Sequence, residues 1–137
     1  MMRPFLLDTC ACLWIVADEI SEKAAQAVTA TRDAGLSVYV SPITAWEIGI
    51  LFGKGRLRSN YAPQRWFELL LSKPSVALAP LTPAALMDSW FLPPGIGDDP
   101  ADRIIAATAR EFGYTVMTRD KALLDYGREG HLSVLEC

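Results

Sequence analysis

Short apolar runs alternate along the chain with longer segments that have helix-capping residues before them or a glycine after them. The short runs fit buried strands, and the longer segments fit helices. The pattern predicts strands at residues 4–7, 36–40, 75–79, 114–118 and 132–135. It predicts helices at residues 10–17, 21–34, 42–52, 63–72, 82–90, 100–112 and 121–125.

This alternation of strands and helices predicts the class of fold. Strands separated by helices form a mostly parallel sheet with helices on both faces, so we expect a three-layer α/β domain. Residues 1–137 contain no internal repeat, low-complexity tract or long linker, and we expect them to form one domain. Ligand sites in such sheets lie beyond the carboxyl ends of the strands.

Composition narrows the classes of function. Hydrophobic residues make up 51% of the 137 positions, which argues against disorder. The net charge of −3 lacks the basic character of a pure nucleic-acid-binding module, although it is compatible with an enzyme whose bound cation supplies positive charge. Three cysteines, Cys10, Cys12 and Cys137, provide neither a disulfide framework nor a zinc-ribbon spacing.

The sequence predicts a cytoplasmic protein with no membrane partner. The odd number of cysteines favours a reducing compartment. The apolar stretch after Arg3 superficially resembles a signal peptide, but Asp8 lies inside it. No run approaches the roughly 18 uncharged apolar residues that a transmembrane helix requires.

Four acidic residues stand where solvent-facing acids are uncommon. Asp8 and Asp120 follow predicted strands, Asp102 lies at the start of a predicted helix, and Glu47 lies on the apolar face of another. Charged groups near a core are costly unless something compensates them. A divalent cation is the simplest compensation for several carboxylates at once, because hard cations prefer oxygen ligands.

Each acid also has a plainer structural interpretation. Asp8 and Asp120 fit the N-cap positions of the helices that follow them, and so does Asp99 ahead of Pro100. Asp102 would be favoured by the dipole at its helix N-terminus, and the adjacent Arg103 could balance its charge. Glu47 could instead be a snorkelling acid at the edge of its apolar stripe or one member of a buried ion pair, and Trp46 extends that stripe.

The segments that carry these acids resemble the motifs of PIN-domain ribonucleases, most closely the VapC-type toxins of prokaryotic toxin–antitoxin pairs. The resemblance runs in order along nearly the whole chain, and its more specific parts are the Trp-Glu and Asp-Pro-x-Asp-Arg helices. The matching segments are Leu6-Leu7-Asp8-Thr9, Ser41-Pro42-Ile43-Thr44-Ala45-Trp46-Glu47-Ile48, Asp99-Pro100-Ala101-Asp102-Arg103-Ile104-Ile105-Ala106-Ala107-Thr108-Ala109 and Thr118-Arg119-Asp120.

The resemblance implies a PIN-like fold and a Mg²⁺- or Mn²⁺-dependent endoribonuclease. Its acidic positions carry over to Asp8, Glu47, Asp102 and the more variable Asp120. Asp8 and Asp102 are then the principal metal ligands, with Glu47 a ligand or water-orienting base and Asp120 a supporting group. The resemblance also implies homodimerisation and inhibition by a cognate antitoxin protein.

The chain departs from the family pattern at three positions near these motifs. Cys10 and Gly97 stand where many members have histidine, and Ala101 stands where an aromatic residue is frequent. The metal ligands are unaffected by these changes, whereas a shared substrate preference does not follow. Thr9, Asp99 and Thr118 are further candidates for the surroundings of the metal.

Two other segments are candidates for binding partners. Lys54, Arg56 and Arg58 form a basic loop directly after the Glu47 helix, and we expect it to contact RNA phosphates rather than remain a merely solvated loop. A set of large apolar residues exceeds what two short segments need for packing, so about half are expected to form an exposed groove for an antitoxin helix. The set is Tyr61, Trp66, Phe67, Leu70, Trp90 and Phe91.

Other functions fit the sequence less well. A receiver-like, catalytically silent interaction domain would lack some of the four acids, and a phosphoacceptor Asp is missing after residues 36–40. A haloacid-dehalogenase-type phosphatase needs a second Asp where Cys10 stands. A housekeeping PIN-type RNA-processing nuclease remains an alternative to the toxin. The single histidine, His131, lies in a polar turn, where we expect it to be exposed and non-catalytic.

Overall fold

The strands form one parallel sheet in the order β3-β2-β1-β4-β5. The computed structural model describes residues 3–137. Their strands are β1 (Phe5–Leu7), β2 (Val38–Val40), β3 (Val76–Leu78), β4 (Thr115–Thr118) and β5 (Ser133–Glu136). Their helices are α1 (Thr9–Val16), α2 (Glu22–Asp33), α3 (Pro42–Gly53), α4 (Pro63–Leu71), α5 (Pro83–Asp88), α6 (Pro100–Phe112) and α7 (Lys121–Arg128).

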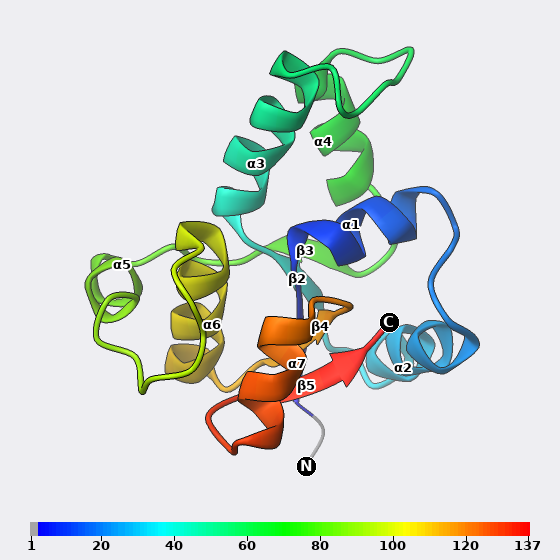
Figure 1. Cartoon of the computed structure of the whole chain (residues 1–137). Coiled ribbons are helices and arrows are strands. Elements are labelled where there is room, and N and C mark those ends of the chain that lie inside the picture. The colour runs from blue at the N-terminus through cyan, green and yellow to red at the C-terminus, as the bar shows by residue number, and fades with distance from the viewer. Residues whose placement is uncertain (1–2) are drawn as a thin grey trace.

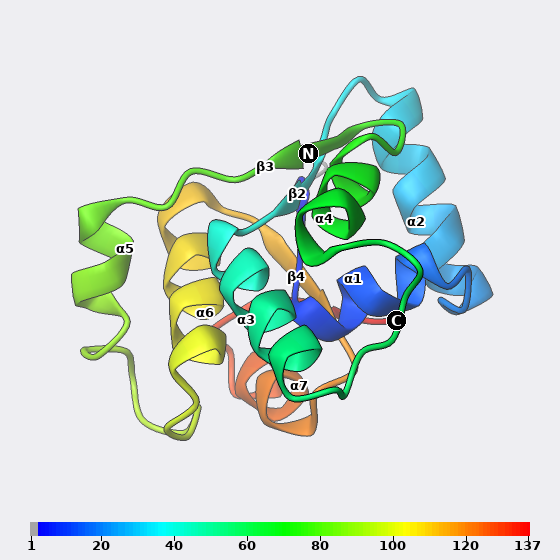
Figure 2. The same ribbon diagram turned by 90° about the horizontal axis from the view of Figure 1, so that it is seen from above.

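Helices cover both faces of this sheet, as Figures 1 and 2 show. Side chains alternate across a strand, so neighbouring residues enter different cores. Leu6 packs into a core with residues of α6 and α7, whereas Leu7 packs into a second core with residues of α1, α2, α3 and α4. The alternation recurs in β4, where Val116 joins the first core and Met117 the second. The predicted three-layer α/β architecture is confirmed.

The central strand, β1, lies at the point where the chain changes direction across the sheet. β1 pairs with β2 on one side and with β4 on the other, with Leu7 opposite Val40 and Met117. The chain therefore leaves β1 toward one half of the sheet and later returns to the other half. Such a switch of direction opens a crevice at the carboxyl ends of the strands.

Side-chain caps begin most helices, as the sequence predicts. Ser21 Oγ accepts from the Ala24 N–H at 3.1 Å, and Ser41 Oγ accepts from the Ile43 N–H at 3.1 Å. Proline stands at the start of α3, α4, α5 and α6, where its missing N–H costs no intrahelical hydrogen bond. These signals explain why the predicted boundaries lie close to the observed ones.

Two helix ends differ from the prediction. Helix α7 continues through Gly127 to Arg128, because this glycine is the point at which the helix touches β5. A Cβ added at Gly127 would lie 2.3 Å from Val134 Cγ2, so close packing requires a glycine. Helix α5 ends at Asp88, and Trp90 and Phe91 lie in the turn beyond it.

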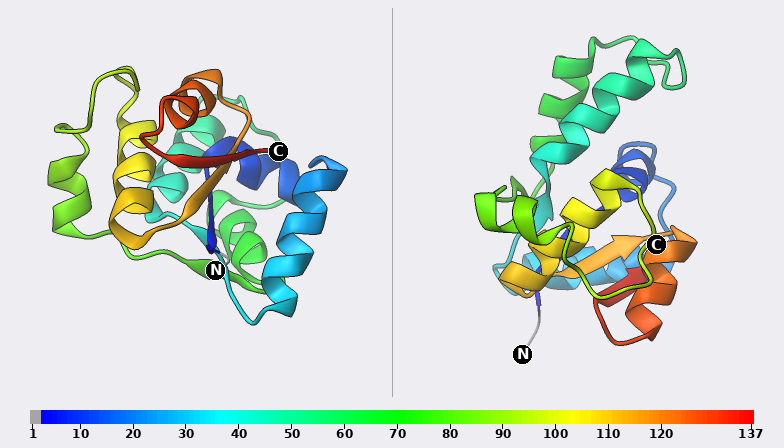
Figure 3. Two further views of the ribbon diagram at one scale, coloured as in Figure 1. Left: turned by 90° about the horizontal axis from the view of Figure 1, so that it is seen from below. Right: turned by 60° about the vertical axis from the view of Figure 1, so that its left-hand side comes forward.

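Helices α3 and α4 form a hairpin that extends away from the sheet (Figures 1 and 3). Trp46 on α3 is 57% exposed, so the expectation that it extends the core-facing stripe is wrong. Helix α3 carries apolar side chains around nearly its whole circumference, and such a helix gives no periodic signal for its buried face. Across residues 3–137, each helix is too short or too polar to span a membrane.

Candidate active site

Asp8 lies at the centre of the carboxyl edge, directly after β1. Its backbone N–H continues the sheet by donating to the Met117 carbonyl at 3.2 Å. Its side chain caps α1, because Oδ1 accepts from the Ala11 N–H at 2.7 Å. Only 3% of Asp8 is exposed, and the Thr118 hydroxyl donates to its other carboxylate oxygen. The cap interpretation is therefore correct, and it leaves the acid buried beside a neighbouring strand.

Asp120 follows β4, the strand next to β1. Its Oδ2 accepts from the Leu123 N–H at 3.0 Å and so caps α7. The Asp120 N–H donates to Thr118 Oγ1 at 2.9 Å, and the same hydroxyl donates to Asp8. Thr118 thus connects the two carboxylate-bearing turns across the switch point of the sheet.

Asp102 enters the site from the first turn of α6. Asp99 caps this helix, with Oδ1 accepting from the Asp102 N–H at 3.0 Å. Arg103 was expected to balance Asp102, and that expectation is wrong. Its guanidinium donates to the carbonyls of Gly97 and Ser89 at 2.7 and 3.0 Å. These bonds fasten the loop before α6 and turn the charge away from the acids.

Glu47 reaches the site from α3 and is partly buried. The Thr9 hydroxyl donates to Glu47 Oε1, and Thr9 Oγ1 also lies 3.1 Å from Thr44 Oγ1. Thr44 is fully buried one turn before Glu47. It was not among the predicted site residues, although a threonine three positions before an inward-facing acid is a usable signal.

Burial and mutual repulsion raise the pKa values of the acids. Burial raises the pKa of Asp8 to about 6, with Asp120 and Glu47 adding to the shift while hydrogen bonds from Thr118 and Ala11 oppose it. Burial likewise raises the pKa of Asp102 to about 7, and four neighbouring carboxylates add to it: Asp99, Asp120, Asp8 and Glu47. All four predicted acids therefore lie within electrostatic range of one another.

The same environment extends to Glu47 and Cys10. Burial raises the pKa of Glu47, and Asp99 raises it further, while the Thr9 hydrogen bond opposes the shift. The pKa of the Cys10 thiol rises to about 11, through burial and then through repulsion from Asp8, Glu47, Asp102 and Asp120. Cys10 is therefore a neutral thiol at the rim of the acidic site.

Arginine and lysine side chains are not among the causes of the raised pKa values of Asp8, Glu47 and Asp102. The second nearby arginine, Arg119, stacks 4.1 Å from the Trp14 ring centre and donates to the carbonyls of Glu19 and Cys137. Within residues 3–137, no three His, Cys, Asp or Glu side chains lie close enough together to hold a metal ion as they stand. The acids are thus gathered and unneutralised, without forming a finished ligand cage.

An apolar cleft of about 530 Å³ adjoins the acids. It lies between α1 and the loop before α4, and Cys10 forms part of its wall together with Leu13, Trp14, Arg58 and Trp66. Arg58 therefore shares a cleft with Cys10, whose thiol lies within electrostatic range of the acids. Lys54 and Arg56 are exposed on the same loop.

The large apolar residues divide as expected, with about half in the core. Trp66 and Leu70 are buried and Phe67 is partly buried, whereas Tyr61, Trp90 and Phe91 are exposed. The exposed residues do not form one groove, because Tyr61 precedes α4 while the other two follow α5. These two helices lie on different sides of the molecule in Figures 1 and 2.

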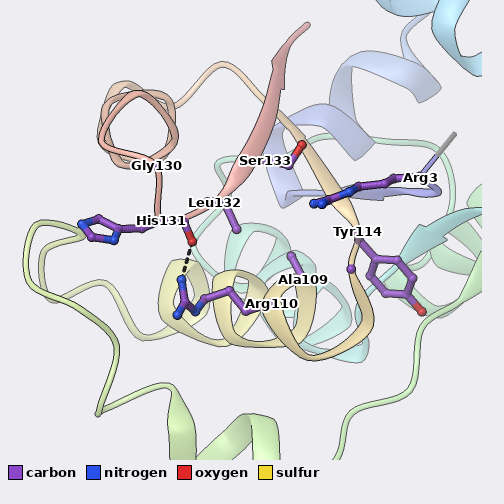
Figure 4. Close-up of a pocket in the computed structure, with 9 residues that line it drawn as sticks. Arg3, Ala109, Arg110, Tyr114, Gly130, His131, Leu132 and Ser133 are labelled. Atoms are coloured by element: carbon purple, nitrogen blue, oxygen red, sulfur yellow. Dashed lines mark hydrogen bonds between the residues drawn. The ribbon is translucent and has the colours of Figure 1, made fainter. Parts of the chain in front are cut away.

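A second pocket, of about 470 Å³, lies at the opposite edge of the sheet (Figure 4). Arg3, Arg110 and His131 line it, and Arg110 donates to the His131 carbonyl. His131 is partly buried, with its ring against Tyr126. It does not approach the acids, because it precedes β5 and they follow the carboxyl ends of the strands.

Known proteins with a similar sequence or fold share this arrangement of elements. Ribonuclease VapC22 of Mycobacterium tuberculosis is 29% identical over 124 residues, covering 89% of this chain and 91% of that protein. A chain of the VapBC2 structure from Rickettsia felis, bound to a promoter DNA fragment, has a TM-score of 0.71 at 14% identity, with 96% and 97% of the two chains covered. The DNA-bound VapBC structure from Salmonella typhimurium gives 0.63 at 20% identity, with 98% of each chain covered.

The structural similarities at these low identities establish the fold alone. The family assignment comes from the sequence, because the PIN domain model matches residues 5–129. That span includes all four acids, from the turn after β1 to the turn after β4. The chain belongs to the PIN domain family.

Proposed function

We propose that this chain is a divalent-metal-dependent endoribonuclease and the toxin of a type II toxin–antitoxin pair. The observation that carries the proposal is the set of four acids at the carboxyl edge, where burial and then repulsion from neighbouring carboxylates raise the pKa values of Asp8 and Asp102. The similarity to Ribonuclease VapC22 supports the reaction. The similarity to VapBC structures supports the kind of partner.

Mg²⁺ or Mn²⁺ fits the chemistry of these residues. The donors are carboxylates and hydroxyls, which hard cations prefer, and the Cys10 thiol stays protonated. Asp8 and Asp102 would hold the ion, which would compensate the burial and the mutual repulsion that raise their pKa values. When bound, a divalent cation neutralises charge on the scissile phosphate and favours the ionisation of a water molecule.

The remaining residues orient and support these ligands. Glu47 serves as a further ligand or orients the attacking water, and the Thr9 hydroxyl holds one of its oxygens. Asp120 supports the site from the turn after β4, where its Oδ2 caps α7. Thr118 steadies Asp8, and Asp99 fixes the first turn of α6 from which Asp102 projects.

RNA is the proposed substrate, and the basic loop is its proposed contact. The four acids repel a phosphate backbone, so the chain needs positive charge close to the site. Arg58 is best placed for this role, because it shares the cleft wall with Cys10. Lys54 and Arg56 extend the same exposed loop.

Cleavage of RNA by the purified chain tests the reaction. The wild-type chain should cleave single-stranded RNA with Mg²⁺ or Mn²⁺ and lose this activity in EDTA. Asp102→Asn keeps the shape of the side chain and removes its charge, so cleavage should fall by at least about 100-fold. Glu111→Gln removes an exposed acid from the far end of α6 and should leave cleavage unchanged. Equal activity of wild type and Asp102→Asn would contradict the proposal.

The apolar cleft is the proposed binding site of the antitoxin. An amphipathic helix fits a groove of this kind by its apolar anchors, and a basic residue on it would reach the acids past Cys10. Expression of the chain alone should arrest growth, and co-expression of its cognate antitoxin should restore it. Harmlessness of the wild-type chain alone would favour a housekeeping PIN-type nuclease or a catalytically silent domain.

A variant of the cleft separates antitoxin binding from cleavage. Ala17 lines the cleft and is exposed, so Ala17→Arg fills the groove without entering the core. This variant keeps all four acids and Arg58, so it should still cleave RNA while resisting neutralisation by the antitoxin. Ala30→Arg, on the exposed face of α2, is the matched control and should be neutralised normally.

We also propose that the chain is a cytoplasmic homodimer. Trp46, Met87, Trp90 and Phe91 are each more than half exposed, on α3 and around α5. Helices α3 and α5 both pack against α6. Several large apolar side chains exposed on neighbouring elements are typical of an interface. Sedimentation should give a dimer for the wild type and a monomer for Phe91→Glu. The three free cysteines fit a reducing compartment.

A further inference from the structure

A chain of hydroxyl groups links helix α1 to helix α3 beside Glu47. Thr9 Oγ1 contacts two partners, the Glu47 carboxylate and the Thr44 hydroxyl, the latter at 3.1 Å. Thr44 is fully buried and Thr9 is 8% exposed, so the bond between their hydroxyls is shielded from bulk water. A path of hydrogen bonds therefore runs from inside α3 through α1 and back to the acid on α3.

Counting protons fixes the direction of this path. A threonine hydroxyl has one hydrogen to donate, and an ionised carboxylate can only accept. The hydrogen of Thr9 is used on Glu47, so Thr9 must accept in its bond with Thr44. Thr44 is then the donor, and the order is Thr44 to Thr9 to Glu47. Successive bonds of this kind polarise and strengthen one another.

Thr44 differs in this respect from other buried helical threonines. Thr31 and Thr108 donate to the carbonyls four residues earlier, at 2.9 and 2.8 Å, as helical threonines commonly do. The corresponding carbonyl for Thr44 belongs to Val40 in β2, and it accepts from the Ala79 N–H at 2.8 Å. The Thr44 hydroxyl contacts Thr9 on α1 instead of a carbonyl of its own helix.

We propose that Thr44 is a positioning residue that acts through Thr9 to hold the Glu47 carboxylate at the acidic site. The proposal rests on the function proposed above, in which Glu47 binds the metal or orients water. A free glutamate side chain has several rotatable bonds, and fixing it costs conformational entropy. The relay fixes one carboxylate oxygen before any metal arrives, so less ordering remains to be done on binding.

Metal affinity is the first test, measured by calorimetry with Mg²⁺ on the full chain. Thr44→Val keeps the volume of the side chain and removes the hydroxyl, so it should weaken Mg²⁺ binding by about tenfold. Thr44→Ser restores the hydroxyl and should bind Mg²⁺ as the wild type does. Cleavage at limiting Mg²⁺ should follow the same order.

Thr31→Val is the matched control for packing. It removes a threonine hydroxyl that is as buried as that of Thr44. The Thr31 hydroxyl donates only to the Ala27 carbonyl of its own helix. This variant should lower the melting temperature and leave Mg²⁺ affinity unchanged. If Thr44→Val binds Mg²⁺ like the wild type, or Thr44→Ser fails to restore binding, Thr44 is only a packing residue and the proposal is wrong.

A double-mutant cycle without metal makes the test independent of the proposed function. The relay passes through Thr9, so Thr44→Val and Glu47→Gln should be coupled in urea unfolding of the metal-free chain, and this coupling should vanish in a Thr9→Val background. The unfolding constant of the double variant should differ at least about threefold from the product of the single effects. Absence of Mg²⁺ binding by the wild type would overturn the proposed function, whereas additivity in this cycle would overturn the relay.

Discussion

At the carboxyl edge of the sheet, four acids face one another without a cation, whereas at the amino edge the charged groups have structural partners. Arg110 donates to the His131 carbonyl (Figure 4). His131 Nε2 lies 3.8 Å from Glu129 Oε2. Both edges belong to the same parallel sheet and differ only in which end of the strands they occupy. The amino edge resembles a structural surface, whereas the gathered carboxylates of the carboxyl edge suit the binding of a cation.

The two arginines nearest the acids make this contrast sharper. Arg103 and Arg119 follow directly on Asp102 and Thr118 in the sequence, yet both guanidinium groups turn outward. Arg103 lies 4.6 Å from the Trp90 ring centre, and Arg119 lies 4.1 Å from that of Trp14. Positive charge close in sequence is therefore used for packing, and the acids are left for an external cation.

The largest expected difference between the edges is in cleavage. Asp8→Asn at the carboxyl edge should lower RNA cleavage by at least about 100-fold, because it removes a charge that stabilises the metal and the reaction. Arg110→Gln at the amino edge should leave cleavage within about twofold and lower the melting temperature through its lost hydrogen bond. Steady-state rates and thermal melts of both variants measure the contrast. A cleavage defect in Arg110→Gln as large as that in Asp8→Asn would remove the distinction.

The pH dependence of stability is the next largest effect. The pKa of Asp8 rises from 3.8 to about 6 and that of Asp102 from 3.8 to about 7, so the folded chain binds protons more tightly than the unfolded chain. The metal-free chain should therefore be most stable near pH 4 and lose stability as the pH rises toward 7. For the buried Asp8 the loss is about 2–3 kcal/mol.

Urea unfolding at several pH values measures this loss. Asp8→Asn should make the curve shallower between pH 4 and 6, because Asp8 no longer titrates while Asp102 still does. Mg²⁺ at millimolar concentration should restore stability at pH 8 by binding the folded state. Arg110→Gln should keep the wild-type slope. A metal-free chain that gains stability between pH 4 and 7 would contradict the assignment of uncompensated acids.

The elements and the acids were predictable from sequence because their signals are local. Apolar runs mark the strands, and caps such as Ser21 and Ser41 mark helix starts. Parallel strands bring their carboxyl ends to one edge, so acids that follow strands were expected to meet. Glu47 was predictable for another reason, since it is a charged residue within an apolar helix.

The predictions that were wrong concerned features that depend on tertiary packing. The exposure of Trp46 was missed because α3 is apolar on nearly all sides, and only the packing of neighbours selects its buried face. The end of α7 was missed because Gly127 signals a helix end locally, yet the contact with Val134 requires a glycine there. The directions of Arg103 and Thr44 depend on Trp90 and on Thr9, which are distant in sequence.

The structural role of Arg103 gives a moderate effect. Arg103→Met keeps the apolar stem and removes the guanidinium, so the hydrogen bonds to Gly97 and Ser89 and the contact with Trp90 are lost. The free energy of unfolding should fall by about 1–3 kcal/mol. The Mg²⁺ affinity of this variant should stay within about twofold of the wild-type affinity, since the Arg103 charge already points away from the acids.

An exposed arginine provides the control for that variant. Arg65 forms a surface pair with Glu68 at 3.2 Å, with its side chain 59% exposed. Pairs of this kind contribute about 0–1 kcal/mol, so Arg65→Met should be nearly neutral. If Arg103→Met instead leaves stability unchanged and weakens or strengthens Mg²⁺ binding tenfold, the arginine acts on the acids and the contrast between the edges must be revised.

The smallest effect is expected in the basic loop, where the carboxyl edge meets its substrate. Each phosphate contact contributes about 0.7 to the salt dependence of binding to a single strand. Replacing Lys54, Arg56 and Arg58 by alanine should therefore reduce the slope of log affinity against log salt by up to about 2. Arg58→Ala alone should account for about a third of this, because Arg58 lines the cleft beside Cys10.

Charge-matched variants distinguish contact from a general effect of net charge. Replacing Lys23, Arg32 and Lys73 removes the same charge from α2 and from the turn after α4. Both triple variants are made in a catalytically inactive Asp102→Asn chain, and binding to single-stranded RNA is measured by fluorescence anisotropy across a salt series. The variant of Lys23, Arg32 and Lys73 should keep the slope of the chain with an unchanged loop. Equal slopes for the two triple variants would mean that the loop is solvated surface, and that the acids recruit RNA through their metal alone.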